Sequence, residues 1–176
     1  MKLTTKLKIS AGALAIAAVS VTSAQAYTET FTMSVAFANP FSFTEAVAAD
    51  FATLINVNTT YELAPDSTLT PGAGGGQVTG TAAAGTYTVI DSAAGGTVDI
   101  TVDNQQAGVN GFVTIDEFNC DYGGGAAVGG VSCSFPGAAN PGAGTALRVG
   151  FDITVANDPA DADTDTADFD VTVGYS

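Results

Sequence analysis

The chain contains no histidine and no tryptophan, and only 4 of its 176 residues are basic. Without histidine it lacks the side chain that most often acts as a general base near neutral pH. The Ser-His-Asp triad and every His-ligated metal site are excluded for the same reason. Without tryptophan, the chain also lacks the side chain that most often stacks on a sugar ring. These absences favour a protein without enzymatic activity.

The lysines are confined to the start of the chain. All three lie within residues 1–8, an apolar run follows at residues 9–21, and the small residues of Ala24-Gln25-Ala26 come next. This order is typical of a bacterial secretory signal peptide that is cleaved after Ala26. A membrane anchor is the alternative, but the apolar run is shorter than a bilayer span requires. We expect an exported protein in the periplasm, at the cell surface or outside the cell, with no membrane span after cleavage of residues 1–26.

Cleavage would leave a strongly acidic chain. Arg148 would be its only basic residue against 18 acidic residues, a formal net charge of −17. A nucleic-acid partner is excluded, because binding to a phosphate backbone needs many Lys and Arg side chains. An anionic membrane surface would repel the chain. Cation binding, or solubility alone, remains open as the role of the acidic residues.

Cys120 and Cys133 are the only cysteines. In an oxidising compartment, such a pair predicts one disulfide. The bridge would close a loop of about 14 residues and stabilise the fold by roughly 3 kcal/mol. A metal site would need further ligands, and the chain offers neither histidine nor a third cysteine.

Apolar residues recur at every second position through most of the exported part. The pattern is clearest at residues 30–37, 97–103, 147–155 and 169–175. Strict alternation of β-branched and aromatic residues with polar ones predicts half-buried β-strands. Further strand candidates are residues 41–47, 51–57, 86–90, 112–118 and 131–135. Residues 44–54 have room for a short helical turn at most.

Glycine and proline punctuate these alternating runs. Loops are expected at residues 71–76, 93–96, 123–130 and 136–144. Short strands at this spacing predict a single all-β domain over residues 27–176, an Ig-like or pilin-like β-sandwich of about seven to nine antiparallel strands. A β-solenoid is the alternative, but it needs a fixed internal repeat, and the sequence shows none.

The densest run of charge lies at residues 158–170. Its candidate calcium ligands are Asp161, Asp163, Asp165 and Asp168. Carboxylates at every second position resemble the start of a calcium-binding loop. An EF-hand, however, needs Gly where Thr166 stands and Glu where Thr172 stands. Two interpretations stay open: a weak Ca²⁺ site, or a solvated acidic hairpin whose like charges protect a sheet edge from other edges.

Two other patterns suggest enzymes, and we interpret both as structural. Adjacent acids such as Asp116-Glu117 resemble the carboxylate pair of a glycosidase. Adjacent residues on a strand point to opposite faces, however, so these two carboxylates are not expected to converge. The glycine-rich loops have neither the strand–GxGxxG–helix context of a dinucleotide site nor the lysine of a phosphate-binding loop. The sequence therefore predicts no catalytic residue and no cofactor other than Ca²⁺.

Several segments together resemble a known family. They are residues 38–44 (ANPFSFT), 49–55 (ADFATLI), 77–80 (QVTG), 147–155 (LRVGFDITV) and 168–175 (DFDVTVGY). They are similar to the bacterial secreted family catalogued as domain of unknown function 4402, although Ala52 stands where the family tends to have Gly. The resemblance implies an Ig-like β-sandwich related to spore coat protein U and archaic chaperone–usher pilins. It also implies a non-enzymatic surface or fibre subunit, whose partners are copies of itself or other surface subunits.

Pilin-like subunits assemble by β-strand addition, in which an extension of one subunit completes the sandwich of the next. Residues 28–38 are the candidate donor here, because they directly follow the expected cleavage site. Their apolar comb consists of Phe31, Met33, Val35 and Phe37. The alternative is that this segment forms the first strand of its own sandwich. A stand-alone, Ca²⁺-stabilised exported module is the alternative to a fibre subunit.

Overall fold

The alternating segments form β-strands in the computed structural model, which describes residues 40–55, 58–93, 95–155 and 164–176. These residues belong to one unit, 40–176. The strands are β1 (Phe41–Val47), β2 (Thr53–Leu54), β3 (Thr59–Leu63), β4 (Leu69–Pro71), β5 (Gln77–Thr79), β6 (Gly85–Asp91), β7 (Val98–Asp103), β8 (Val113–Tyr122), β9 (Val128–Gly130), β10 (Cys133–Ala138), β11 (Thr145–Val155) and β12 (Asp170–Tyr175). The described residues contain no α-helix, and hence none that could span a membrane.

The long strand β11 is the centre of a 7-stranded sheet. One edge of β11 pairs with β8 from Leu147 to Val155. The other edge pairs first with β6, at residues 145–149, and then with β3, at residues 151–155. β1, β4 and β9 extend the sheet by pairing with β6, β3 and β8 respectively, and all these pairs are antiparallel.

A smaller sheet of three strands, in the order β10-β7-β12, packs on the large one. The β7 side chains Val98, Ile100 and Val102 are completely buried between the two sheets. From the large sheet, Leu147 and Val149 of β11 are completely buried in the same core. The alternation in the sequence therefore marks the residues that fill this interior.

The predicted disulfide is confirmed. Cys120 of β8 and Cys133 of β10 are bonded, with their Cα atoms 6.1 Å apart. β8 belongs to the large sheet and β10 to the small one, so the bond ties the two layers together. Both cysteines are completely buried.

The all-β sandwich is also confirmed, but with more strands than the seven to nine expected. The described residues form twelve, because the short strands β2, β4, β5 and β9 add to the long ones. β2 and β5 form a separate two-stranded pair. Residues far apart in sequence pair within two stacked sheets, which is not the arrangement of a solenoid.

The strand predicted at residues 51–57 is much shorter in the structure, where β2 contains only Thr53 and Leu54. Ala52 has a φ of 59°, a left-handed conformation that does not continue a strand. Its N–H donates to Oδ1 of Asp50 at 2.7 Å and closes a tight turn. The helical turn considered for residues 44–54 is absent, because β1 continues to Val47 and Asp50 makes a β-bridge to Ala83.

Candidate functional site

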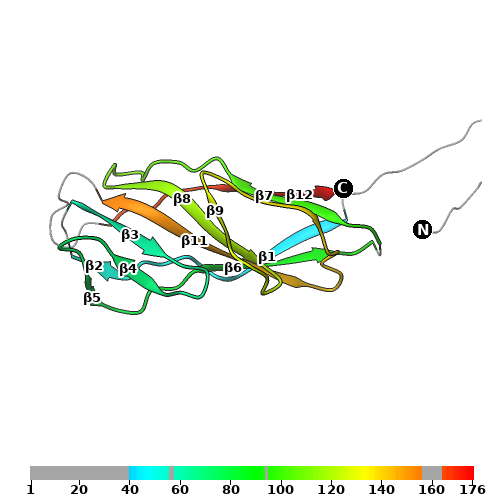
Figure 1. Ribbon diagram of the computed structural model, residues 1–176, viewed down its shortest axis with the longest axis horizontal. Coiled ribbons are helices and arrows are strands. Elements are labelled where there is room, and N and C mark those ends of the chain that lie inside the picture. Colours follow the sequence, from blue (N-terminus) through cyan, green and yellow to red (C-terminus); the bar gives the residue numbers. More distant parts are fainter. Residues whose placement is uncertain (1–39, 56–57, 94, 156–163) are drawn as a thin grey trace, which may run out of the picture. The chain divides into compact units, whose positions relative to one another are not determined.

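The small sheet does not cover the whole inner face of the large one. Figure 1 shows β7 and β12 over the half of the large sheet that contains β1 and β6, whereas β3 and β4 lie at the other end. At that other end, the inner face consists of Phe151, Ile153 and Val155 of β11, together with Val113 and Ile115 of β8. Segments outside the small sheet flank these apolar side chains.

An open cleft of about 770 Å³ lies against this face. Its floor is formed by the same residues of β8 and β11. One wall consists of residues 49–55, and the other consists of residues 164–167 with Phe169. Most of the lining side chains are apolar, while Asp50 and Asp165 add carboxylates.

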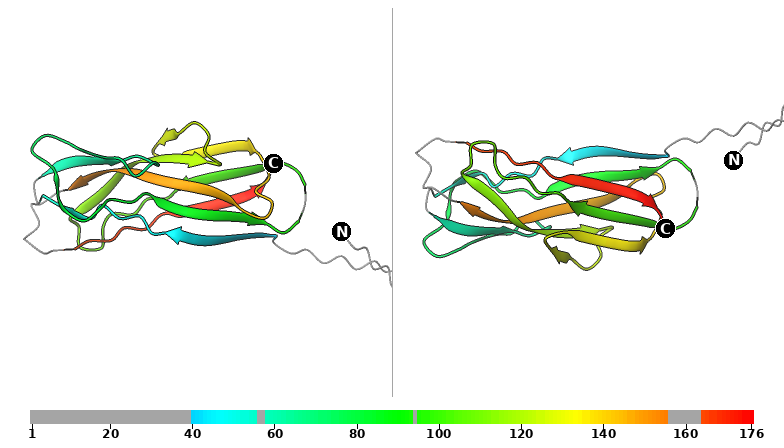
Figure 2. Two further views of the ribbon diagram at one scale, coloured as in Figure 1. Left: turned by 90° about the horizontal axis from the view of Figure 1, so that it is seen from below. Right: turned by 90° about the horizontal axis from the view of Figure 1, so that it is seen from above.

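A second, smaller cleft of about 310 Å³ continues the first one between β1 and the segment before β12. The two clefts share Ala49, Ala167 and Phe169. The second cleft adds Glu45 of β1 and Tyr87 of β6. We call the two clefts together the side groove. Figure 2 shows that β1 (cyan) and β12 (red) run along the same long side of the sandwich.

The inner face of β1 is incompletely covered along this side. Phe43 pairs with Val89 of β6, so both side chains lie on the same face of the sheet. Val89 is completely buried in the core, but Phe43 is 43% exposed. Glu45 likewise pairs with Tyr87, whose ring packs edge-on against Phe169 at 6.0 Å. Burial, and secondarily the charge of Glu45, raise the pKa of the Tyr87 hydroxyl.

The outer edge of β12 is unpaired among the described residues, since β12 forms a ladder only with β7. An unpaired edge presents backbone N–H and C=O groups that can hydrogen-bond an additional strand. Such a strand would lie over the side groove and cover Phe43. The arrangement thus combines a hydrogen-bonding edge with an apolar trough beside it.

One end of this side of the sandwich is closed. The rings of Phe41 and Tyr175 lie 4.8 Å apart and join β1 to β12. The Tyr175 hydroxyl donates to the Asp91 carboxylate, at 2.9 and 3.0 Å from its two oxygens, and Nδ2 of Asn140 donates to the same group at 2.6 Å. Desolvation opposes ionisation of Asp91, but these donors and the Ala93 N–H outweigh it and lower the pKa of Asp91. These contacts therefore close the side of the sandwich at the end where β1 begins and β12 ends.

The wall at residues 49–55 is held by hydrogen bonds to the neighbouring loop. Asp50 and Ala83 exchange two backbone hydrogen bonds, at 2.7 and 2.8 Å, and the Ile55 N–H donates to the Gly76 carbonyl at 2.8 Å. The buried Tyr61 hydroxyl donates to the Ile55 carbonyl at 2.9 Å and accepts from the Gly76 N–H at 3.3 Å. These bonds fix the position of this wall without a long strand.

The opposite wall is held by the side chain of Asp165. Its Oδ1 accepts from the backbone N–H groups of Asn110 and Thr166, at 2.8 and 2.9 Å. Its Oδ2 accepts from those of Phe112 and Val113, at 2.9 and 3.1 Å. Partial burial alone would raise the pKa of Asp165, but the four donors together outweigh this effect and lower it. The carboxylate therefore stays charged throughout the neutral range.

The structure places two of the four candidate calcium ligands. Asp165 directs both carboxylate oxygens toward backbone donors, as described above, and Asp168 is exposed, with its carbonyl accepting from the Gln106 N–H at 2.8 Å. Asp161 and Asp163 lie outside the described residues. Across the part of the chain that the structure describes, no three His, Cys, Asp or Glu side chains are grouped closely enough to hold a metal ion. Calcium binding stays a prediction.

The expectation that Asp116 and Glu117 point to opposite faces is wrong. β8 contains a bulge here, because Asp152 of β11 pairs with Glu117 and the next residue, Ile153, pairs with Ile115. The extra residue turns both carboxylates to the exposed face, while Ile115 and Phe118 stay buried. Desolvation and the charge of Glu62, with smaller contributions from Glu117 and Asp116, raise the pKa of Asp152.

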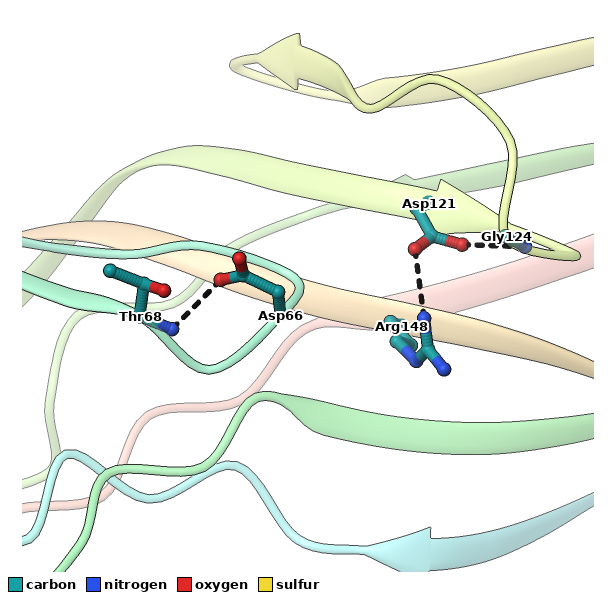
Figure 3. Close-up of polar contacts among 5 residues, drawn as sticks. All are labelled: Asp66, Thr68, Asp121, Gly124 and Arg148. Carbon is teal, nitrogen blue, oxygen red and sulfur yellow. Dashed lines mark hydrogen bonds and ion pairs between the residues drawn. The ribbon is translucent and has the colours of Figure 1, made fainter.

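Arg148 lies on the large sheet, where it pairs across strands with Asp121. Its Nη1 is 3.2 Å from Oδ2 of Asp121, and Oδ1 of the same carboxylate accepts from the Gly124 N–H at 3.0 Å (Figure 3). Figure 3 also shows the turn before β4, where Asp66 accepts from the Thr68 N–H at 2.9 Å. None of these residues lines the side groove.

The candidate donor residues Phe31, Met33, Val35 and Phe37 lie outside the described residues. The sequence predicted the strands that form the groove floor, but not the groove itself, because neither of its walls is a regular strand over its length. In the comparisons, no protein-family model, no curated protein and no solved structure matched this chain.

Proposed function

We propose that this protein is an exported, non-enzymatic bacterial surface subunit that assembles by β-strand addition at the free edge of β12. The observation that carries the proposal is the inward-facing but exposed Phe43, which lies beside an unpaired strand edge and an apolar groove. A sandwich that is complete along this side would cover such a side chain. The occupant of the groove is an extended segment with apolar residues at alternate positions.

The segment that fits best is residues 28–38 of a second copy of the chain. Its comb of Phe31, Met33, Val35 and Phe37 has the period of two that strand addition requires. Glu29 is its only charged residue, which suits a groove whose carboxylates would repel an acidic peptide. The Phe41–Tyr175 contact closes this side of the sandwich next to the start of β1, where the chain's own preceding segment would have to turn back to enter the groove. This favours a second copy as the source of the strand.

The conformation of Ala52 supports the resemblance to the domain of unknown function 4402 family. The family tends to have Gly at this place, and Ala52 adopts a φ of 59°, a region that Gly enters most readily. The backbone at this wall of the groove therefore has the conformation for which glycine is suited, although this chain carries alanine. An Ig-like or pilin-like sandwich, exported by a signal peptide, is part of the same proposal.

The test compares the oligomeric state of residues 27–176 with that of the same chain lacking residues 27–38, by size-exclusion chromatography with light scattering. We expect the longer chain to form concentration-dependent polymers and the shorter one to be a folded monomer. A double substitution in the comb, Phe31→Ser with Val35→Ser, should also abolish polymers. Thr32→Asn with Ser34→Asn, on the opposite face of the segment, should retain them.

Two outcomes would refute the proposal. A monomer that is unchanged by the deletion would mean that residues 27–38 do not join copies. A monomer that unfolds on deletion, as judged by circular dichroism, would mean that the segment is an internal strand of its own sandwich.

A further inference from the structure

The wall of the side groove at residues 164–169 is not part of a strand ladder. Two backbone hydrogen bonds connect it to the preceding loop, from Gln106 to the Asp168 carbonyl at 2.8 Å and from Val109 to the Thr166 carbonyl at 2.9 Å. The Asn110 side chain adds a third, to the Thr164 carbonyl at 2.7 Å. The position of this wall therefore depends on the loop at residues 104–112.

Asp165 is the centre of this connection. Its two oxygens accept four backbone N–H groups, three of which belong to Asn110, Phe112 and Val113. Phe112 and Val113 line the groove themselves, so the same carboxylate fixes both the wall and the adjoining floor. Hydrogen bonds to an ionised group are about twice as strong as neutral ones.

Glycine at position 108 leaves room for this carboxylate. A Cβ at Gly108 would overlap the carboxyl group of Asp165. The Gly108 N–H donates to the Val113 carbonyl at 2.8 Å, and its own carbonyl accepts from the Gly111 N–H at 2.9 Å. The absence of a side chain at Gly108 leaves the space in which the loop closes around Asp165.

We infer that Asp165, seated against Gly108, is the positioning residue that sets the shape of the side groove for the incoming strand. The inference rests on the proposed function, because it assumes that the groove receives a strand. It gives one aspartate of the acidic run a role as an acceptor of backbone N–H groups. A carboxylate with four N–H donors has little capacity left for a cation, so this role differs from that of a calcium ligand.

The test measures the affinity of a fluorescent peptide with the sequence of residues 28–38 for four proteins. The acceptor is the chain of residues 27–176 with Phe31→Ser and Val35→Ser, which removes its own comb without shortening the chain. Asp165→Asn and Gly108→Ala are added to this acceptor separately. The matched control is Glu117→Gln, which likewise removes one negative charge, at an exposed position of β8 that does not line the side groove.

We expect Asp165→Asn and Gly108→Ala each to weaken peptide binding by about tenfold or more, and Glu117→Gln to change it by less than about twofold. Affinities are compared well below the melting temperature of each variant, so that a loss of stability alone would leave them unchanged. Hydrogen exchange should show lost protection at Asn110, Phe112 and Val113 in Asp165→Asn.

The outcomes separate this inference from the proposed function. If the acceptor does not bind the peptide at all, the proposed function fails, and the inference fails with it. If the acceptor binds and both variants bind equally well, only the role of Asp165 is refuted. Equal weakening by Glu117→Gln would also refute it, because the effect would then be one of overall charge and not of the Asp165 hydrogen bonds.

Discussion

Individual carboxylates in this acidic chain differ in what surrounds them, and their pKa values differ accordingly. Asp91 and Asp165 each accept several hydrogen bonds, which lower their pKa. Asp152 is in the opposite situation, because its cross-strand neighbours on the large sheet are Glu62 on β3 and Glu117 on β8. Three carboxylates in a row across adjacent strands repel one another, and among the described residues the Asn119 side chain alone donates to Asp152, at 2.8 Å.

We predict that Asp152→Asn stabilises the fold at neutral pH. The raised pKa of Asp152 means that the folded state binds a proton more readily than the unfolded state. The charged aspartate therefore destabilises the folded state most at pH values above its folded pKa. Relief of like-charge pairing on an exposed sheet face contributes about 0.5–1 kcal/mol, or ~1–4 °C in melting temperature. The gain should shrink as the pH falls through the folded pKa toward about 3.9, the unfolded value.

The measurement is a series of thermal scans of the wild-type chain and Asp152→Asn between neutral pH and about pH 3. Asp91→Asn is the control of opposite sign, because the native donors favour its charged form. That variant should be destabilised at neutral pH, with a difference that begins to shrink only below about 3.9, the unfolded value, because the folded pKa of Asp91 is lowered. A melting temperature of Asp152→Asn below that of the wild type at neutral pH would contradict the prediction.

At the scale of the strand, β11 pairs with three other strands of the large sheet. It pairs with β8 on one edge and exchanges β6 for β3 on the other, within a single uninterrupted strand. Gly150 lies between the last residue that pairs with β6 and the first that pairs with β3. A Cβ at this position would overlap the Leu63 carbonyl, so the β3 backbone approaches β11 as closely as glycine allows.

We predict that Gly150→Ala destabilises the fold by about 3 kcal/mol or more, because backbone atoms of β3 would have to move. The control is Gly174→Ala in β12, where a Cβ would meet nothing within 4 Å. That substitution should change stability by less than about 0.5 kcal/mol. Urea unfolding followed by fluorescence of the five tyrosines measures both variants. If Gly150→Ala were as stable as the wild-type chain, the prediction would be wrong, because β3 could then shift without a loss of stability.

The strands with long alternation were predictable, and the residues between them were not. The residues of β7, β11 and β12 were predicted almost to their ends, because period two directly records which side chains face the core. β9 was expected to be loop, because its Val128–Gly130 lies in a glycine-rich stretch and its pairing with β8 leaves no sequence signal. The bulge at Asp116 was missed for a similar reason, since a bulge is set by pairing with β11.

The groove was beyond sequence reasoning for the same physical cause. Its floor follows from alternation, but its walls are held by hydrogen bonds between loops and by two side chains, Tyr61 on one side and Asp165 on the other. Nothing in the sequence distinguishes Asp165 from the other aspartates of its run. The signal that was available was Gly108, yet a lone glycine in a loop indicates a turn at least as often as a close contact.

At the scale of the whole molecule, charge and assembly oppose each other. Each copy of residues 27–176 carries a formal net charge of −17, so copies repel one another before any strand is exchanged. The Arg148 guanidinium is engaged by Asp121 of its own chain. The groove and the proposed donor segment interact through apolar side chains and backbone hydrogen bonds, which salt does not screen. Salt should therefore weaken the repulsion and leave the attraction intact.

We predict that association of residues 27–176 becomes stronger as NaCl rises from about 10 mM to about 150 mM, where the screening length falls from ~30 Å to ~8 Å. Light scattering against protein concentration gives the midpoint of association at each salt concentration, and the chain lacking residues 27–38 should remain monomeric throughout. Weaker association in salt would mean that ion pairs join the copies.

CaCl₂ and MgCl₂ at matched ionic strength separate screening from binding. If the acidic run is only a solvated surface, the two salts shift the midpoint equally, whereas a larger shift with Ca²⁺, abolished by Asp161→Asn with Asp163→Asn, would assign a calcium site to that run.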